Sequence, residues 1–234
     1  MVKITFIKKV TLLLLSFLPV LILAQQDKTG NWIMYFGTNK LNDKFSIHTE
    51  FQYRNHTVNT VDTEQLLPRI GLNYHLSKTA TVTVGYAYIP SYTFESVQTA
   101  PEIEEHRIWQ QFISTNIIRK VKLEHRYRFE QRFVNSDYKN RFRYRIMFFV
   151  PLNKPKIEKE TLFLGLYDEI FINDKNTFFD RNRLYGGIGY QVNKNLSLQT
   201  GVLHQQVSNF GKFYLQFAVI FNTDLKNKNK NLNN

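Results

Sequence analysis

The sequence predicts an all-β protein, and more specifically an antiparallel transmembrane β-barrel of 10–12 strands of the outer-membrane type, preceded by a cleaved signal peptide. Aromatic residues make up 15% of the 234 residues, and such residues are enriched in strands. Apolar and polar residues alternate with a period of two over most of the chain, while one long apolar run stands at the N-terminus. The chain has no cysteine, which excludes a disulfide scaffold and any cysteine-built metal or redox site.

The first element is the N-terminal segment 1–24, which has the features of a signal peptide. A basic start is followed by an apolar run from Val10 to Leu23 and by Ala24, a small residue before the cleavage point. Fourteen apolar residues are few for a transmembrane helix and suit the hydrophobic region of a signal peptide. An uncleaved membrane anchor is the alternative, because Ile22 is large for a cleavage site.

Eleven alternating segments follow, and they predict one barrel domain over residues 25–222, with a polar basic tail over 223–234. A period of two that persists over about ten residues indicates a strand whose two faces meet different environments. The alternation is clearest in Phe45–Tyr53, Ala80–Tyr88, Val121–Phe133, Phe142–Val150, Leu196–Val202 and Phe213–Phe221. The candidate strands are 31–37, 44–54, 66–76, 79–89, 105–117, 120–133, 140–150, 161–172, 181–192, 195–206 and 211–222.

The connections between these strands alternate between tight turns and longer loops. We expect loops at 55–64, 90–104, 135–139, 173–180 and 207–210, and tight turns elsewhere except at 151–160. Short turns on one side and longer loops on the other are typical of an outer-membrane barrel. Such a barrel should have an even number of strands, so either the short segment 32–37 lies outside the wall or one strand is miscounted. Pro68 within a strand suggests a bulge there.

Alternation alone does not say which face points inward, and a soluble, lipocalin-like binding barrel would place the apolar face inside. Three observations favour charges inside and apolar residues outside. Strand glycines share the polar face, where crowding in the lumen favours glycine. The apolar faces carry more bulk than a small barrel encloses. An aromatic girdle near strand ends fits a membrane surface. The glycines are Gly71, Gly85, Gly187, Gly189 and Gly201, and the girdle residues are Tyr53, Tyr74, Tyr88, Tyr144 and Tyr190.

Several segments are similar to an uncharacterised outer-membrane family of Bacteroidota, known as domain of unknown function 2490. They are Asn31-Trp32, Ile70-Gly71-Leu72-Asn73-Tyr74, Glu105-His106-Arg107-Ile108-Trp109-Gln110, Leu123-Glu124-His125-Arg126-Tyr127-Arg128, Tyr167-Asp168-Glu169-Ile170, Asn182-Arg183-Leu184-Tyr185 and Gly189-Tyr190. The resemblance extends from about residue 30 to 222. It implies an outer-membrane barrel of a Gram-negative cell and brings no activity, ligand or catalytic residue.

Catalytic, metal and cofactor signals are weak. The six histidines never pair at a metal-ligand spacing, so we expect no metal and no cofactor. One enzymatic alternative is an outer-membrane phospholipase-like hydrolase, because Gly201 to Gly211 resembles the G-x-x-H-x-S-N-G pattern of that class. His204 and Ser208 would be its base and nucleophile, but four residues separate them instead of two, and their hydrogen bond is not assured.

The net charge of +12 has two interpretations once a signal peptide is assumed. Nucleic acid becomes an unlikely partner, whereas outer-membrane lipid and lipopolysaccharide, and a small anionic solute, are the expected ones.

Pairing around a loop at 135–139 would place Arg132 opposite Arg141, Glu130 opposite Arg143 and Arg128 opposite Arg145. Opposed like charges destabilise a sheet, so this row requires carboxylates from elsewhere around the wall.

The sequence therefore predicts a lumenal charge network in a narrow or plugged barrel, with Glu50 and one of Asp168 or Glu169 reaching across the lumen. Its function would be structural, or the binding and transport of a small anion by surplus arginines. The candidate residues are Glu50, Glu124, Arg126, Arg128, Glu130, Arg132, Arg141, Arg143, Arg145, Asp168, Glu169 and Arg183.

Overall fold

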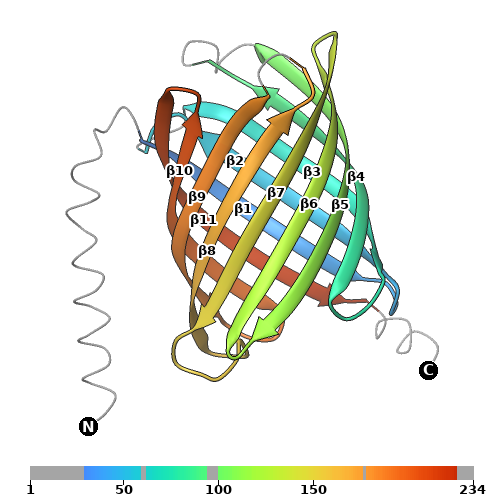
Figure 1. Cartoon of the computed structure of the whole chain (residues 1–234), viewed down its shortest axis with the longest axis vertical. Helices are drawn as coiled ribbons and strands as arrows, with labels where there is room; N and C mark the ends of the chain where they lie inside the picture. The colour runs from blue at the N-terminus through green and yellow to red at the C-terminus, as the bar shows by residue number, and fades with distance from the viewer. Residues whose placement is uncertain (1–28, 59–61, 94–99, 176–177, 226–234) are drawn as a thin grey trace.

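A computed structural model describes residues 29–58, 62–93, 100–175 and 178–225, and these form one closed barrel of eleven strands (Figure 1). The predicted signal peptide lies outside the described residues, as does most of the predicted tail. No helix in the described ranges is long and apolar enough to cross a membrane. The strands are β1 (Thr29–Lys40), β2 (Phe45–Asn55), β3 (Thr63–His75), β4 (Ala80–Ser91), β5 (Ile103–Ile118), β6 (Val121–Val134), β7 (Asp137–Pro151), β8 (Thr161–Asn173), β9 (Phe179–Gln191), β10 (Leu196–Val207) and β11 (Phe210–Asp224).

The barrel closes through a parallel pairing of its first and last strands. β1 pairs with β2 in the antiparallel sense and with β11 in the parallel sense, from Thr29 opposite Phe213 to Lys40 opposite Asp224. The expectation of an even strand number is therefore wrong, and the short first segment is a full wall strand. An even number is required only where the first and last strands are antiparallel, and here β1 and β11 run in the same direction (Figure 1).

The connections are less asymmetric than the sequence suggests. At the end of the barrel where β1 begins, the connections are 56–62, 92–102, 135–136, 174–178 and 208–209; at the other end they are 41–44, 76–79, 119–120, 152–160 and 192–195. Two of the expected loops are thus two-residue turns, at Asn135 and at Ser208, and both residues adopt a positive φ, of 51° and 49°. Asparagine enters this left-handed region more readily than most residues.

The bulge expected at Pro68 is also misplaced. β2 and β3 stay in register past Pro68, which lies opposite Phe51, and their register shifts instead between Arg54 and Asn55. On the other side of β3, pairing with β4 is interrupted between Gln65 and Arg69 without a shift. Because proline has no N–H, an interrupted ladder is sufficient to accommodate it.

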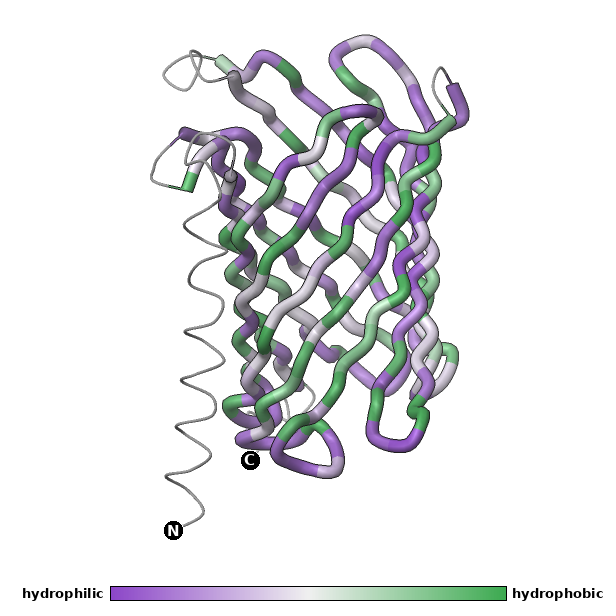
Figure 2. The backbone as a smooth tube through the Cα atoms, turned by 60° about the vertical axis from the view of Figure 1, so that its left-hand side comes forward, coloured by the Kyte–Doolittle hydropathy of each residue, from purple (hydrophilic) through white to green (hydrophobic). Residues whose placement is uncertain are grey.

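Apolar side chains cover the outside of the barrel and charged side chains lie inside. Ile33, Ile70, Phe142 and Leu184 are each more than half exposed, whereas Glu130 is completely buried. Figure 2 shows the corresponding alternation of hydrophobic and hydrophilic residues along the wall strands. This arrangement is the reverse of a lipocalin-like barrel, so that alternative is wrong. The girdle prediction fails at Tyr144, because that residue lies at the middle of β7.

The interior glycines accommodate large aromatic rings against the wall. Any Cβ at Gly85 would stand 2.4 Å from the Trp109 ring, and one at Gly71 would stand 2.9 Å from it. Tyr185 lies in the same way against Gly187 and Gly201. The prediction that crowding selects glycine on the inner face is therefore confirmed at these positions. The inner wall near the β1–β11 seam is also apolar, with a buried cluster of Trp32, Met34, Tyr185, Leu203, Tyr214 and Ala218.

Candidate functional site: the basic lumen

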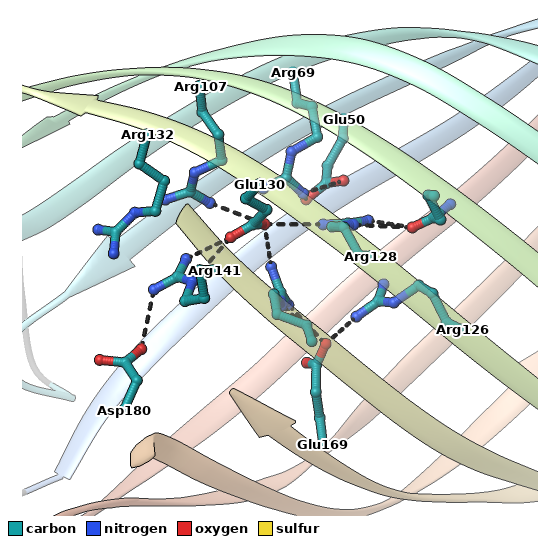
Figure 3. Close-up of polar contacts among 12 residues, drawn as sticks. Glu50, Arg69, Arg107, Arg126, Arg128, Glu130, Arg132, Arg141, Glu169 and Asp180 are labelled. Atoms are coloured by element: carbon teal, nitrogen blue, oxygen red, sulfur yellow. Dashed lines mark hydrogen bonds and ion pairs between the residues drawn. The ribbon is translucent and has the colours of Figure 1, made fainter. Parts of the chain in front are cut away.

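Glu130 on β6 lies at the centre of the interior charges (Figure 3). Its carboxylate oxygens are 2.7 Å from Arg141 Nη2, 2.8 Å from Arg143 Nη1 and 3.3 Å from Arg107 Nη1. Arg128 Nη1 is 3.8 Å away. The side chain of Glu130 has no exposed surface. One carboxylate thus serves four arginines from three adjacent strands.

Other carboxylates continue this network along neighbouring strands. Glu169 Oε1 on β8 is 2.7 Å from Arg126 Nη2 and 2.8 Å from Arg143 Nη2. Asp180 Oδ2 on β9 is 3.1 Å from Arg141 Nη1. Arg143 therefore bridges Glu130 to Glu169. Arg141 bridges Glu130 to Asp180 (Figure 3).

Three further carboxylates hold the arginines nearer to β2, β5 and the opposite end of the barrel. Both carboxylate oxygens of Glu50 accept from Arg69 Nη1, at 2.7 and 2.8 Å. The remaining close pairs are Glu105 with Arg107 at 2.6 Å and with Arg132 at 2.7 Å, and Glu124 with Arg145 at 2.6 Å. Contrary to expectation, Glu50 and Glu169 do not reach across the lumen to their partners, because arginines on adjacent or next-adjacent strands meet them.

The register between β6 and β7 differs by two residues from the expected one. Glu130 pairs with Arg141, Arg128 with Arg143, Arg126 with Arg145, and Arg132 with Lys139. The cause is the turn at 135–136, which is three residues shorter than the expected loop. Arginines still oppose each other, now as Arg128 with Arg143 and Arg126 with Arg145, and the partner of Glu130 changes from the expected Arg143 to Arg141.

The structure places all the predicted network residues inside the barrel except one. Asp168 is exposed on the outer face, where both of its carboxylate oxygens accept from Asn182 Nδ2 at 3.1 Å. Sequence reasoning missed seven interior charges: Arg54, Arg69, Glu105, Arg107, Lys122, Asp180 and Arg181. The alternation of the sequence could have predicted that some of these side chains face inward. Glu105 and Arg107 alternate with outward residues in β5, and Arg69 lies on the same face of β3 as Gly71.

The interior contains a cavity of about 680 Å³ whose lining carries an excess of positive charge. Its lining includes eleven arginines and Lys122 but only four glutamates. Glu130 and Asp180 also pair with these arginines, which leaves six positive charges in excess. Arginine stays protonated in proteins. The lining of the cavity is therefore basic.

The proposed catalytic pair does not assemble. Ser208 lies in the turn after β10, while His204 lies within β10 and packs its ring 4.7 Å from that of Phe213. In the described structure no hydrogen bond joins the two side chains, and a hydrogen bond from the base is what activates a serine. Among the described residues, no group of three or more His, Asp or Glu side chains could hold a metal ion.

Comparison with known proteins identifies a family but no activity. A family model described as "Protein of unknown function (DUF2490)" matches residues 29–216, from β1 into β11. No curated protein and no solved structure matches the chain.

Proposed function

Since the chain belongs to the DUF2490 family of proteins of unknown function, we propose from its geometry that it is an outer-membrane β-barrel whose narrow basic lumen binds small anionic solutes and lets them pass. The observation that carries this proposal is the excess of six positive charges over carboxylates among the side chains that line the cavity or pair with its arginines. A purely structural network would instead pair its charges internally.

The outer surface supports a membrane location. Its exposed residues include Ile33, Phe51, Tyr86 and Phe217, so an apolar band faces outward on strands of 11 to 16 residues. Transmembrane strands need about 9–11 tilted residues. Lipid and lipopolysaccharide would then be the partners of the wall, and residues 1–24 would act as the signal peptide that directs export.

The test is conductance of the refolded protein in a planar bilayer under a KCl gradient. Heat-modifiable mobility on a gel first confirms that the barrel has folded. We expect small single-channel currents and a reversal potential of the sign for anion selectivity, because a lumen of one charge concentrates counter-ions. A folded barrel without current would refute passage, and cation selectivity would refute the basic lumen.

A further inference from the structure

Two arginines in the lumen differ from all the others in their contacts. The guanidinium carbon of Arg54 lies 3.8 Å from the centre of the Trp32 ring, and that of Arg183 lies 4.8 Å from it. Arg183 also lies 4.7 Å from the centre of the Phe171 ring. Trp32 is 3% exposed and Arg183 is 6% exposed. Two buried or half-buried cations thus pack on one indole ring.

Neither of these arginines forms an ion pair within 4.0 Å of a carboxylate oxygen among the described residues. Every other arginine of the cavity lies within 4.0 Å of at least one carboxylate oxygen. The nearest acidic group by sequence and fold, Glu64, accepts from Tyr214 Oη at 3.3 Å and lies 4.0 Å from Lys212 Nζ. Its charge acts on Arg54, but no ion pair joins the two side chains in the described part of the chain.

Glutamines hold both guanidinium groups in place without neutralising them. Arg54 donates to Gln52 Oε1 through Nε at 3.0 Å and Nη2 at 2.6 Å, and to Gln65 Oε1 through Nη1 at 2.8 Å. Arg183 Nε donates to Gln205 Oε1 at 2.8 Å, and the structure gives its two terminal nitrogens no partner in the described part of the chain. The orientation is fixed while the charge and most of the N–H groups of Arg183 remain available.

We propose that Arg54 and Arg183 form an oxyanion site of the phosphate type on Trp32, a proposal that rests on the anion-binding function above and locates it. A buried charge without a partner is unfavourable, and two like charges at one site add repulsion. A tetrahedral oxyanion removes both penalties, since guanidinium groups bind phosphate oxygens through paired N–H donors. The cation–π contacts on Trp32 stabilise the two arginines until the anion binds.

The position of the site favours a soluble anion over a lipid headgroup. Trp32 and Arg54 lie near the end of the barrel where β1 begins and β2 ends, and Arg183 is the fifth residue of β9, three strands from β1 around the seam. The side chains face the cavity rather than the outer surface. A small phosphate entering this mouth of the barrel would reach them, whereas a lipid phosphate outside the wall would not.

The experiment is calorimetric titration of the refolded full-length barrel with inorganic phosphate at constant ionic strength. We expect saturable binding by the parent, and affinity weakened at least about tenfold by Arg54→Gln and by Arg183→Gln, because each loses charge-assisted hydrogen bonds. Arg181→Gln is the matched control: it removes one lumenal charge that Asp180 already pairs at 2.9 Å. Its affinity should stay within about threefold of the parent.

The results separate this site from the broader proposal. Absence of saturable phosphate binding by the parent, or equal weakening by Arg181→Gln, would overturn the site, while anion selectivity in the bilayer experiment would still support the function. A second titration uses purified lipopolysaccharide as competitor. Competition would overturn the assignment to a soluble anion. A folding control is also built in: without phosphate, the two site variants should unfold no earlier than the parent, since each removes an unpaired charge.

Discussion

Replacing Glu130 with glutamine keeps the size of the side chain and removes the negative charge that four arginines share. Glutamine offers one carbonyl oxygen where the carboxylate offers two. In the parent, one oxygen of Glu130 accepts from Arg107 and Arg143, and the other accepts from Arg141 at 2.7 and 2.9 Å. In the variant, either Arg107 and Arg143 or Arg141 must therefore lose the acceptor oxygen and face the N–H groups of the glutamine amide instead.

The expected cost follows from these contacts. A hydrogen bond to a charged group contributes about 1.5–3 kcal/mol, and removing one partner of a buried ion pair costs about 3–5 kcal/mol. Since Glu130 has no exposed surface, water does not replace the lost charge. We expect Glu130→Gln to lower the free energy of unfolding by at least about 3 kcal/mol.

The assay is guanidinium unfolding of the barrel in lipid vesicles, followed by tryptophan fluorescence. Both tryptophans face the interior, and the Arg128 guanidinium lies 4.8 Å from the Trp109 ring, so the signal reports on this region. Glu124→Gln is the control, because Glu124 pairs with Arg145 near the end of the barrel and is 14% exposed. It should cost about 1–2 kcal/mol. If both variants have the same stability, the central network does not hold the barrel together as its geometry implies.

Three further predictions follow from the wall and its turns. Gly85→Ala should lower the free energy of unfolding by about 1–3 kcal/mol, since its Cβ would lie 2.4 Å from the Ile70 carbonyl oxygen. Gly186→Ala should be neutral or stabilise the barrel by up to about 1 kcal/mol, because its Cβ would meet only Leu166, at 3.5 Å. Thermal unfolding of the two variants tests this difference. Ile33→Cys combined with Phe217→Cys should form a disulfide across the parallel seam, because these residues are register partners, and the cross-link should change mobility on a non-reducing gel. Ile33→Cys with Phe221→Cys should not, as the two lie about 13 Å apart along the strand; cross-linking of that control pair instead would disprove the register. Arg119→Gly should stabilise by about 0.5–1 kcal/mol, since Arg119 has a φ of 55° that glycine adopts without strain, and a lower melting temperature would contradict this.

The wall could be predicted from sequence because its signal is local. A period of two reveals both a strand and its two faces, so the segment 120–133 anticipates β6 (Val121–Val134) closely. For the first strand the pattern predicts only 31–37, because the last residues of β1, Thr38 to Lys40, are polar. The glycines could be assigned to the inner face because they share its parity, and the Trp109 ring occupies the space that Gly85 leaves.

The charge network could be predicted only in part because its pairs depend on register. The turn between β6 and β7 is three residues shorter than expected, and the register therefore places Arg141 opposite Glu130. The face of Asp168 and Glu169 could not be chosen from composition, since adjacent acidic residues point to opposite sides of a strand. Arg54 and Arg183 could not be distinguished from the other arginines, because their lack of a carboxylate depends on strands that lie far apart in the sequence.

The parallel seam has a consequence for the order in which this barrel can assemble. Ten of its eleven strand pairings join consecutive strands, so each can form as soon as a hairpin has been made. The pairing of β1 with β11 joins residues 184 positions apart, as in the hydrogen bond from Thr223 to Asn39, and contacts this distant in sequence form slowly. A parallel ladder is also slightly weaker per residue than an antiparallel one. Until the last strand arrives, the curled sheet has two unpaired edges, and a chain truncated before β11 has no complementary strand with which to close.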